Sequence, residues 1–154
     1  MNKPLFKIKD NVRHVSIIKK TASRICSAQV LYGSSFLECD IDLLIKSYMD
    51  NYLKLILLEL GIKKIDNDLF NSITRGVFKN KLSIDHIISR HLSKDWSFNR
   101  LSETEKSVLR LATYELCFDK KFKKIIIINE YISIIESFGG NPNFANGILE
   151  NISK

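Results

Sequence analysis

The chain has 154 residues, of which 45% are hydrophobic, and this is enough to build the core of one domain or of two small lobes. No apolar run approaches the roughly 20 residues that a membrane span needs, and the N-terminal sequence MNKPLFKIKDNVRH lacks the apolar stretch of a secretory signal. We therefore expect a cytoplasmic protein without a membrane segment, in which the three cysteines stay reduced.

The net charge of +7 is concentrated at the N-terminus. Residues 1–24 hold seven lysines and arginines and one acid, so this segment carries +6 and the rest of the chain is nearly neutral. Such an asymmetry indicates contact with a polyanion, either a nucleic acid or an anionic membrane surface, although a solvated tail would show the same pattern.

The apolar residues recur mostly at three- and four-residue steps, which predicts helices throughout the chain. The first two helices are expected over about 15–32 and 41–60, each followed by a glycine that ends it. A third, LFNSITRGVFKN, follows Asp66 or Asp68 as its N-cap, and its Gly76 permits close helix packing.

The second half of the chain predicts four more helices. One is expected over about 84–92, and the next begins with Ser102 and Glu105 in the S-x-x-E pattern of a capping box. The following helix contains IIIINEYISIIESF, whose opening isoleucine run would equally suit a strand. Asn141 and Pro142 then supply an N-cap and a first-turn proline for the last helix, NFANGILENI.

These seven helices predict an all-α fold of two packed helical bundles. We divide the chain into an N-terminal helical subdomain with a basic arm, 1–80, and a C-terminal helical subdomain, 81–154, which together form one compact unit.

The side chains that could bind a metal or act in catalysis are not spaced in a way that favours either function. His86 and His91 are five residues apart, so a helix does not align them as metal ligands. Glu115 and Glu130 fall near apolar faces, where a structural pair with an arginine or a backbone amide is favoured over acid–base catalysis. We therefore predict that the protein is not an enzyme and has no metal site and no cofactor.

The cations of the first helix share one side. At about 100° per residue, Arg13, Lys20 and Arg24 fall within roughly 40° of one another and form a strip about 16 Å long. The helix macrodipole disfavours cations at this end, so their presence needs a reason. Phosphate binding supplies one, because fixed cations release the counterions condensed on a nucleic acid. The alternative is an ordinary solvated face.

A second basic group, Lys120, Lys121, Lys123 and Lys124, surrounds Phe122 in the loop before the sixth helix. Basic residues interleaved with an aromatic ring suit single-stranded RNA, in which bases stack and phosphates pair with cations. Lysine-rich loops between helices are also common, so this pattern alone is a weak indication.

Four segments, in chain order, resemble the NusB transcription antitermination factors: RICSAQVLY, LSETEKSVLRLATYEL, IIINEYISIIESFGG and NFANGILENI. The family pattern has an Arg/Lys-rich start, then A-x-Q-x-L-Y and E-x-x-x-L-R-x-A-x-Y-E-L. It continues with I-N-E before a helix that ends at F-G, and closes with F-x-N-G-x-L. The resemblance runs over about 19–152 and is strongest from Leu101 onward.

The resemblance implies an all-α fold of two helical bundles without catalytic activity. It also implies a partner, the small-subunit ribosomal protein that acts as NusE, with which such proteins bind the boxA RNA element of nascent transcripts. The resulting antitermination complex helps RNA polymerase read through terminators, notably in ribosomal RNA operons. Some members of the family form dimers, so a homodimer also stays open.

The resemblance also assigns residues. Tyr32 and Glu105 fall where the family contacts NusE or the RNA beside it. Together with Arg13 of the basic strip, the expected RNA-binding residues are Arg13, Lys19, Lys20, Arg24, Arg110, Lys124 and Phe144. The residue pattern around Phe144, without the resemblance, favours a core position over a stacking platform.

Two other functions fit a basic helical chain. A NusB-like domain also precedes the catalytic domain of some ribosomal RNA cytosine methyltransferases, which would require a methyl-donor domain further along the chain. A helix-turn-helix DNA binder would carry its cations on a recognition helix after a tight turn, whereas here they open the chain. The favoured hypothesis is an RNA-binding antitermination factor that acts with NusE.

Overall fold

The computed structural model describes residues 15–154, and over this range the chain forms eight α-helices and no strand. In chain order they are α1 (Val15–Ser34), α2 (Ile41–Asn51), α3 (Leu53–Leu60), α4 (Asn67–Lys79), α5 (Lys81–His91), α6 (Glu103–Tyr114), α7 (Lys124–Ser137) and α8 (Pro142–Ser153). A 3-10 turn, Phe98–Arg100, precedes α6, and a π-turn, Glu115–Asp119, follows it. The all-α prediction is confirmed.

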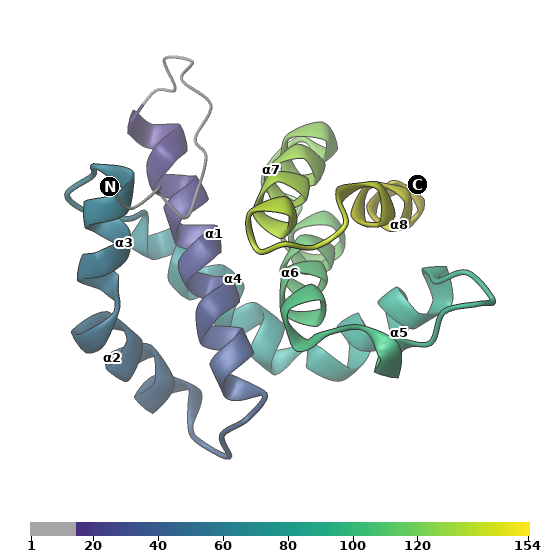
Figure 1. Cartoon of the computed structure of the whole chain (residues 1–154), viewed down its shortest axis with the longest axis horizontal. Coiled ribbons are helices and arrows are strands. Elements are labelled where there is room, and N and C mark those ends of the chain that lie inside the picture. Colours follow the sequence, from purple (N-terminus) through teal and green to yellow (C-terminus); the bar gives the residue numbers. More distant parts are fainter. Residues whose placement is uncertain (1–14) are drawn as a thin grey trace.

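Two helices, α1 and α6, lie at the centre of the helix packing (Figure 1). α1 packs against α2, α3, α4 and α6, while α6 in turn packs against α4, α5, α7 and α8. The buried apolar side chains form one connected cluster to which all eight helices contribute. The expected division at residue 80 stays a prediction; Asn80 is the residue at which α4 ends and α5 begins. None of the helices described here is long and apolar enough to cross a membrane.

The structure differs from the sequence prediction in its first half. The single helix expected over 41–60 is two helices, because the backbone leaves helical geometry at Tyr52. The ring of Tyr52 stacks on that of Tyr48 with centroids 5.8 Å apart. No glycine or proline marks this break, so the apolar pattern does not reveal it. The first helix also continues past Gly33 to Ser34.

The predicted helix ends agree well with the structure. Asp66 caps α4 by accepting a hydrogen bond from a backbone N–H of the first turn. Ser102 and Glu105 form both hydrogen bonds of the capping box at α6, and Asn141 caps α8. Gly61 ends α3 with φ +66°, a left-handed conformation that glycine adopts without a steric penalty.

All three cysteines have free thiols, as expected. Cys26 is buried, and burial raises the pKa of its thiol to about 11, so it stays protonated near neutral pH. Cys39 is exposed and Cys117 is half-buried.

Helices α4 and α6 approach each other closely at Gly76. A Cβ atom added to this glycine would lie 2.1 Å from Cζ of Tyr114, far inside van der Waals contact. The Tyr114 ring is itself stacked on Phe118 with centroids 5.8 Å apart, so it is constrained from the other side. The expectation that Gly76 permits close helix packing is confirmed.

Gly76→Ala should therefore destabilise the protein by about 1–2 kcal/mol, because the Tyr114 ring must leave its place between the two helices. Urea unfolding followed by circular dichroism measures the change. Gly147→Ala in α8 is the matched control: its added Cβ meets nothing within 4 Å, so helix propensity alone should stabilise the protein by up to about 1 kcal/mol. Equal stabilisation by both substitutions would contradict the packing at Gly76.

Candidate nucleic-acid interface

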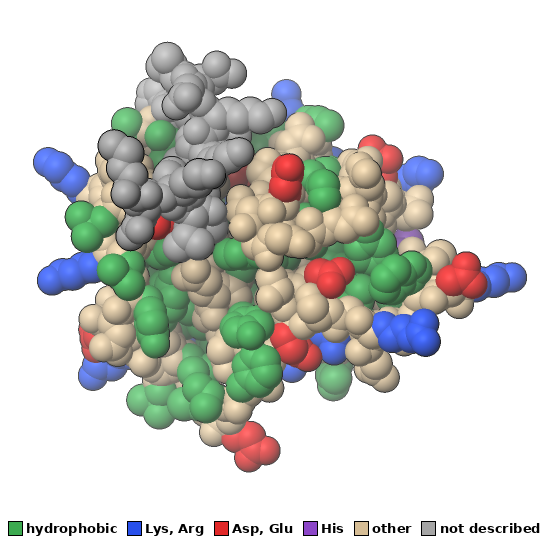
Figure 2. Space-filling view, viewed as in Figure 1, with side chains coloured by type: hydrophobic (Ala, Val, Ile, Leu, Met, Phe, Trp, Pro, Cys, Tyr) green, Lys and Arg blue, Asp and Glu red, His purple; other side chains and the backbone are tan. Residues whose placement is uncertain are grey.

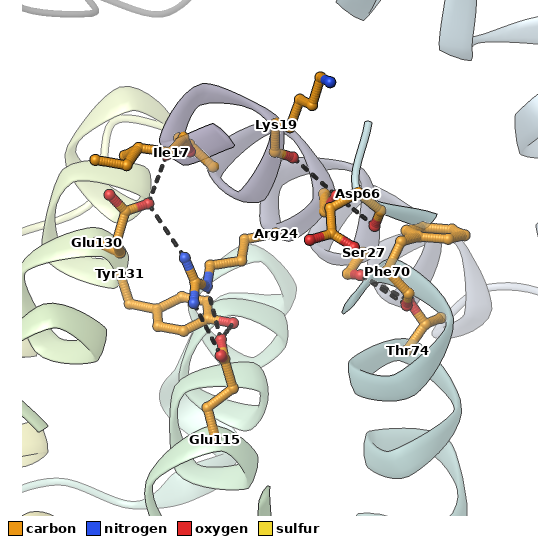
Figure 3. A network of polar contacts seen from close by, with 12 residues as sticks. Ile17, Lys19, Arg24, Ser27, Asp66, Phe70, Thr74, Glu115, Glu130 and Tyr131 are labelled. Carbon is orange, nitrogen blue, oxygen red and sulfur yellow. Dashed lines mark hydrogen bonds and ion pairs between the residues drawn. The ribbon is translucent and has the colours of Figure 1, made fainter. Parts of the chain in front are cut away.

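Arg24, which the sequence placed on the outer strip of the first helix, lies inside the molecule. Its side chain is 2% exposed, and its Nε and Nη2 donate hydrogen bonds to the two carboxylate oxygens of Glu115 at 2.8 and 3.0 Å. Its Nη1 lies 3.6 Å from Oε2 of Glu130 (Figure 3). Arg24 therefore does not belong to a solvent-facing strip, and this corrects its assignment as an RNA contact.

Two buried carboxylates explain the inward position of Arg24. Glu115 in the π-turn and Glu130 on α7 are both buried, and a buried carboxylate without a cation is costly. The planar guanidinium offers two parallel donors that match the carboxylate of Glu115. Burial by itself lowers the pKa of Arg24, but its hydrogen bond with Glu115 and the nearby negative charges outweigh burial and raise it above the ordinary value. The predicted structural pairing of Glu115 and Glu130 with an arginine is thus confirmed.

Two further side chains complete this buried ionic cluster, which consists of Thr21, Arg24, Glu115, Glu130 and Tyr131. The Tyr131 hydroxyl donates to Oε2 of Glu115, and the Thr21 hydroxyl donates to Oε2 of Glu130 at 2.7 Å. Burial raises the pKa of Tyr131 well above its usual value, and the charge of Glu115 raises it further, so the phenol stays protonated as a donor. The cluster ties α1 to the π-turn and to α7 (Figure 3).

Arg110 is the second correction. Its Nε and Nη2 donate to the two carboxylate oxygens of Asp85 on α5 at 2.7 and 2.9 Å, and its guanidinium carbon lies 5.5 Å from the Phe98 ring centroid. The residue is 6% exposed. Arg110 therefore joins α6 to α5 and is not part of a surface that could contact RNA.

The lysines of α1, in contrast, reach the surface. Lys19 and Lys20 are half-buried and line a cleft of about 480 Å³ together with Lys64, from the loop between α3 and α4. Lys20 Nζ donates to the Ser16 hydroxyl at 3.0 Å, and Lys19 points away from the buried ionic cluster (Figure 3). The sequence interpretation missed Lys64; the lysine pair Lys63-Lys64 after the third helix was the available signal. We call this site the basic cleft.

Two hydrogen bonds, one of them from a side chain, hold the loop with Lys64 beside α1. The Asp66 N–H donates to the Lys19 carbonyl at 3.4 Å, and the Ser23 hydroxyl lies 2.8 Å from the Asp66 carbonyl oxygen (Figure 3). Asp66 and Asp68 also line the basic cleft, from the α4 side. The cations therefore come from α1 and the loop, and the acids from the first turn of α4 and its cap.

The remaining candidate RNA contacts are separated in space. Arg13 lies outside the residues that the structure describes. Lys124 is exposed at the start of α7, and its Nζ donates to the carbonyl of Ser153 at the end of α8. Phe144 is half-buried at the start of α8, with its ring 5.3 Å from that of Trp96. Lys124 and Phe144 thus lie near opposite ends of α8.

Tyr32 lines a small recess of about 180 Å³ between α1, α6 and the end of α7, whose lining is mainly apolar. Tyr32 is exposed and packs edge-on against Phe36, with centroids 5.0 Å apart. Thr104 lines the recess too, and its neighbour Glu105 uses Oε1 to accept the capping hydrogen bonds of Ser102. Hydrophobic side chains gather on the lower part of this face, where α1 ends (Figure 2). We call this site the apolar recess.

The two histidines discounted as metal ligands are differently placed. His86 is exposed, and Nδ1 of half-buried His91 lies 2.8 Å from the Ile87 carbonyl oxygen. Between residues 15 and 154, histidine, cysteine and acidic side chains form no group of three that could hold a metal ion.

Arg24→Met should destabilise the protein by about 3–5 kcal/mol, because it leaves buried Glu115 without its cation. The comparison is Arg75→Met, which breaks the exposed ion pair of Arg75 with Asp42 and should change stability by at most about 1 kcal/mol. The double variant Arg24→Met/Glu115→Leu should recover part of the loss, because the unpaired buried charge is gone. Urea unfolding measures all three, and a mild effect of Arg24→Met, similar to that of Arg75→Met, would contradict the structural role.

The NusB family model matches residues 21–154 of this chain. The transcription antitermination protein NusB of Fervidobacterium nodosum is 45% identical over 87 residues, which cover 55% of this chain and 61% of that protein. The protein of the same name from Clostridium botulinum is 31% identical over 89% of this chain and 99% of its own length. This chain therefore spans less than two thirds of the first relative but nearly all of the second.

Solved structures show the same fold. NusB of Thermotoga maritima superimposes with a TM-score of 0.63 at 34% identity, covering 87% of this chain and 89% of that one. A chain from the structure of antitermination factors NusB and NusE in complex with dsRNA gives a TM-score of 0.68 at 24% identity, over 88% of this chain and 96% of its own, which shows a likeness of fold. With its all-α fold, its ordered motifs and the match over residues 21–154, this chain belongs to the NusB family.

Proposed function

We propose that this chain is an RNA-binding transcription antitermination factor that acts in the cytoplasm, together with NusE, on boxA-type RNA. The observation that carries the proposal is membership of the NusB family over residues 21–154, in which the curated relatives are named transcription antitermination proteins. The NusB structure that was solved with NusE and dsRNA has the same fold. The protein acts by binding and carries out no chemical step of its own.

The basic cleft is the proposed RNA surface. Within residues 15–154, Lys19, Lys20 and Lys64 form no salt bridge, so their ammonium groups are available to phosphates. Three cations around one concave site favour a phosphate backbone, because each contact releases a condensed counterion. Arg24 and Arg110 are excluded from this surface because their guanidinium groups are bound to buried or half-buried carboxylates.

The apolar recess is the proposed NusE surface. Tyr32 offers an exposed aromatic side chain, and Glu105 follows Thr104, which lines the recess. Aromatic anchors next to a shallow apolar site are typical of protein–protein interfaces. RNA and NusE would thus contact α1 at different ends, since Lys19 and Lys20 lie near its start and Tyr32 near its end.

A titration of labelled boxA-type single-stranded RNA, with and without NusE, tests the proposal. We expect tighter binding in the presence of NusE, and a preference for boxA-type RNA over a scrambled sequence of the same length. Equal affinity for both sequences with NusE present would contradict the proposed function.

Lys20→Glu/Lys64→Glu should weaken RNA binding at least tenfold at low salt and reduce the slope of log K against log salt by about 2, because two phosphate contacts are lost. Lys46→Glu, an exposed lysine of α2, is the control for a change of net charge. Circular dichroism should show unchanged helicity for both variants. If the double variant keeps the affinity and slope of the control, the RNA surface lies elsewhere.

A further inference from the structure

A second site lined by lysines lies among the C-terminal helices. The loop after the π-turn, the start of α7 and the end of α8 enclose a pocket of about 420 Å³. Four lysines from these segments line it, namely Lys120, Lys123, Lys124 and Lys154. Among the described residues that line this pocket none is acidic, in contrast to the basic cleft. We call it the lysine pocket.

The fold brings these lysines together. Lys124 at the start of α7 is joined to the end of α8 by its hydrogen bond to the Ser153 carbonyl. Phe122 turns inward, and its ring centroid lies 5.2 Å from the guanidinium carbon of Arg24 in the buried ionic cluster. Lys121, the preceding residue, does not line the pocket, but its ammonium lies 5.8 Å from the centroid of the same ring. The Phe122 ring is therefore held between the core and the lysines of the loop.

The remaining lining suits a nucleobase. Phe122, Ile127 and Ile152 contribute an aromatic ring and two branched apolar side chains between the ammonium groups. Ile127 and Ile152 are buried and Phe122 is half-buried, so this floor is held in place by the core. A base has an apolar face and a neighbouring anionic phosphate, and the pocket offers a matching surface to each.

The lysine pocket is connected to the helix that carries the basic cleft. Lys20 of the basic cleft and Arg24 are one helical turn apart on α1, and Arg24 contacts the Phe122 ring that lines the pocket. Arg24 is buried, so this connection runs through the protein interior, and the two sites share no lining residue. An anionic membrane is a poorer match, because a concave pocket cannot lay its lysines against a flat sheet of head groups.

We infer that the lysine pocket binds one nucleotide unit of single-stranded RNA, with the phosphodiester held by the lysines and the base set against Phe122. This inference rests on the proposed function and adds a second contact region to it. The lysines contact the RNA backbone and Phe122 contacts the flat face of a base. Neither contact depends on the RNA sequence.

The test compares a lysine of the pocket with an exposed lysine far from it in the fold. Lys123→Glu removes a cation of the pocket, while Lys46→Glu makes the same charge change on α2. Lys121 is unsuitable as the control, because its ammonium lies 5.8 Å from the centroid of the Phe122 ring. Lys154→Glu changes the opposite wall. All three substituted lysines are exposed, so the fold should be retained, and circular dichroism checks this. Binding is measured by fluorescence anisotropy over a range of salt, on boxA-type RNA and on a uridine oligonucleotide of equal length.

We expect Lys123→Glu and Lys154→Glu each to weaken binding of both RNAs five- to tenfold and to reduce the salt slope by about 1. Lys46→Glu should stay within about twofold of the parent, as expected for a change of net charge alone. Equal effects of Lys123→Glu and Lys46→Glu would overturn the inference. A lack of preference for boxA-type RNA would instead overturn the proposed function, and the uridine oligonucleotide would still report on the pocket.

Amide chemical shifts show whether the lysine pocket prefers RNA to free inorganic phosphate. Uridine oligonucleotide should shift the backbone resonances of Lys123 and Lys124 at micromolar concentrations, whereas inorganic phosphate should do so only at millimolar concentrations. Saturation by inorganic phosphate at the same concentration as RNA would show a simple anion site and overturn the nucleotide assignment. Binding to anionic vesicles that depends on Lys123 but not on Lys46, without any effect of either substitution on RNA binding, would assign the pocket to a membrane instead.

Discussion

The bidentate ion pair between Arg24 and Glu115 is the contact on which the arrangement of the surfaces depends. A charge inside the protein has to be paired, so this contact fixes both the rotation of α1 and its position against the π-turn. Glu130 extends the same constraint to α7. With Arg24 directed inward, Lys19 points away from the cluster, and Lys20, one turn before Arg24 on the same side of the helix, is half-buried. Contacts in the protein interior therefore determine which cations of α1 are exposed to solvent.

The basic residues of α1 therefore serve two purposes. The helix macrodipole disfavours cations only near the first turn, and Lys19, Lys20 and Arg24 all lie beyond the first turn of α1. The partners of Arg24 are the buried carboxylates, and the phosphates of RNA are the proposed partners of Lys19 and Lys20. A single helix thus joins the core of the protein to its proposed nucleic-acid surface, while its other end carries Tyr32 for the partner protein.

Much of the fold could be predicted from the sequence because it is encoded locally. Capping residues such as Asp66 and Ser102 act within three residues of the helices they begin, and the glycine at position 76 is itself the signal for close packing. The break at Tyr52 has no such local signal, so one predicted helix became two.

The candidate site was harder to predict because its decisive contacts are distant in sequence. A helical wheel places Arg24 beside Lys20, but Glu115 lies 91 residues further along the chain and decides the direction of the arginine. The acidic residues were correctly expected to need an arginine, although the sequence could not say which one. The loop with Lys64 is held beside α1 by one backbone hydrogen bond and by the Ser23 hydroxyl, and both join segments more than 40 residues apart in the sequence.

Helix α8 also acts as a rigid spacer. Its 12 residues correspond to a rod about 18 Å long, with Phe144 in its first turn and the lysine pocket at its last. The gap between an aromatic contact and a cationic contact is therefore a fixed length, set by the number of helical turns rather than by a flexible loop. Any ligand that touches both ends must match that length.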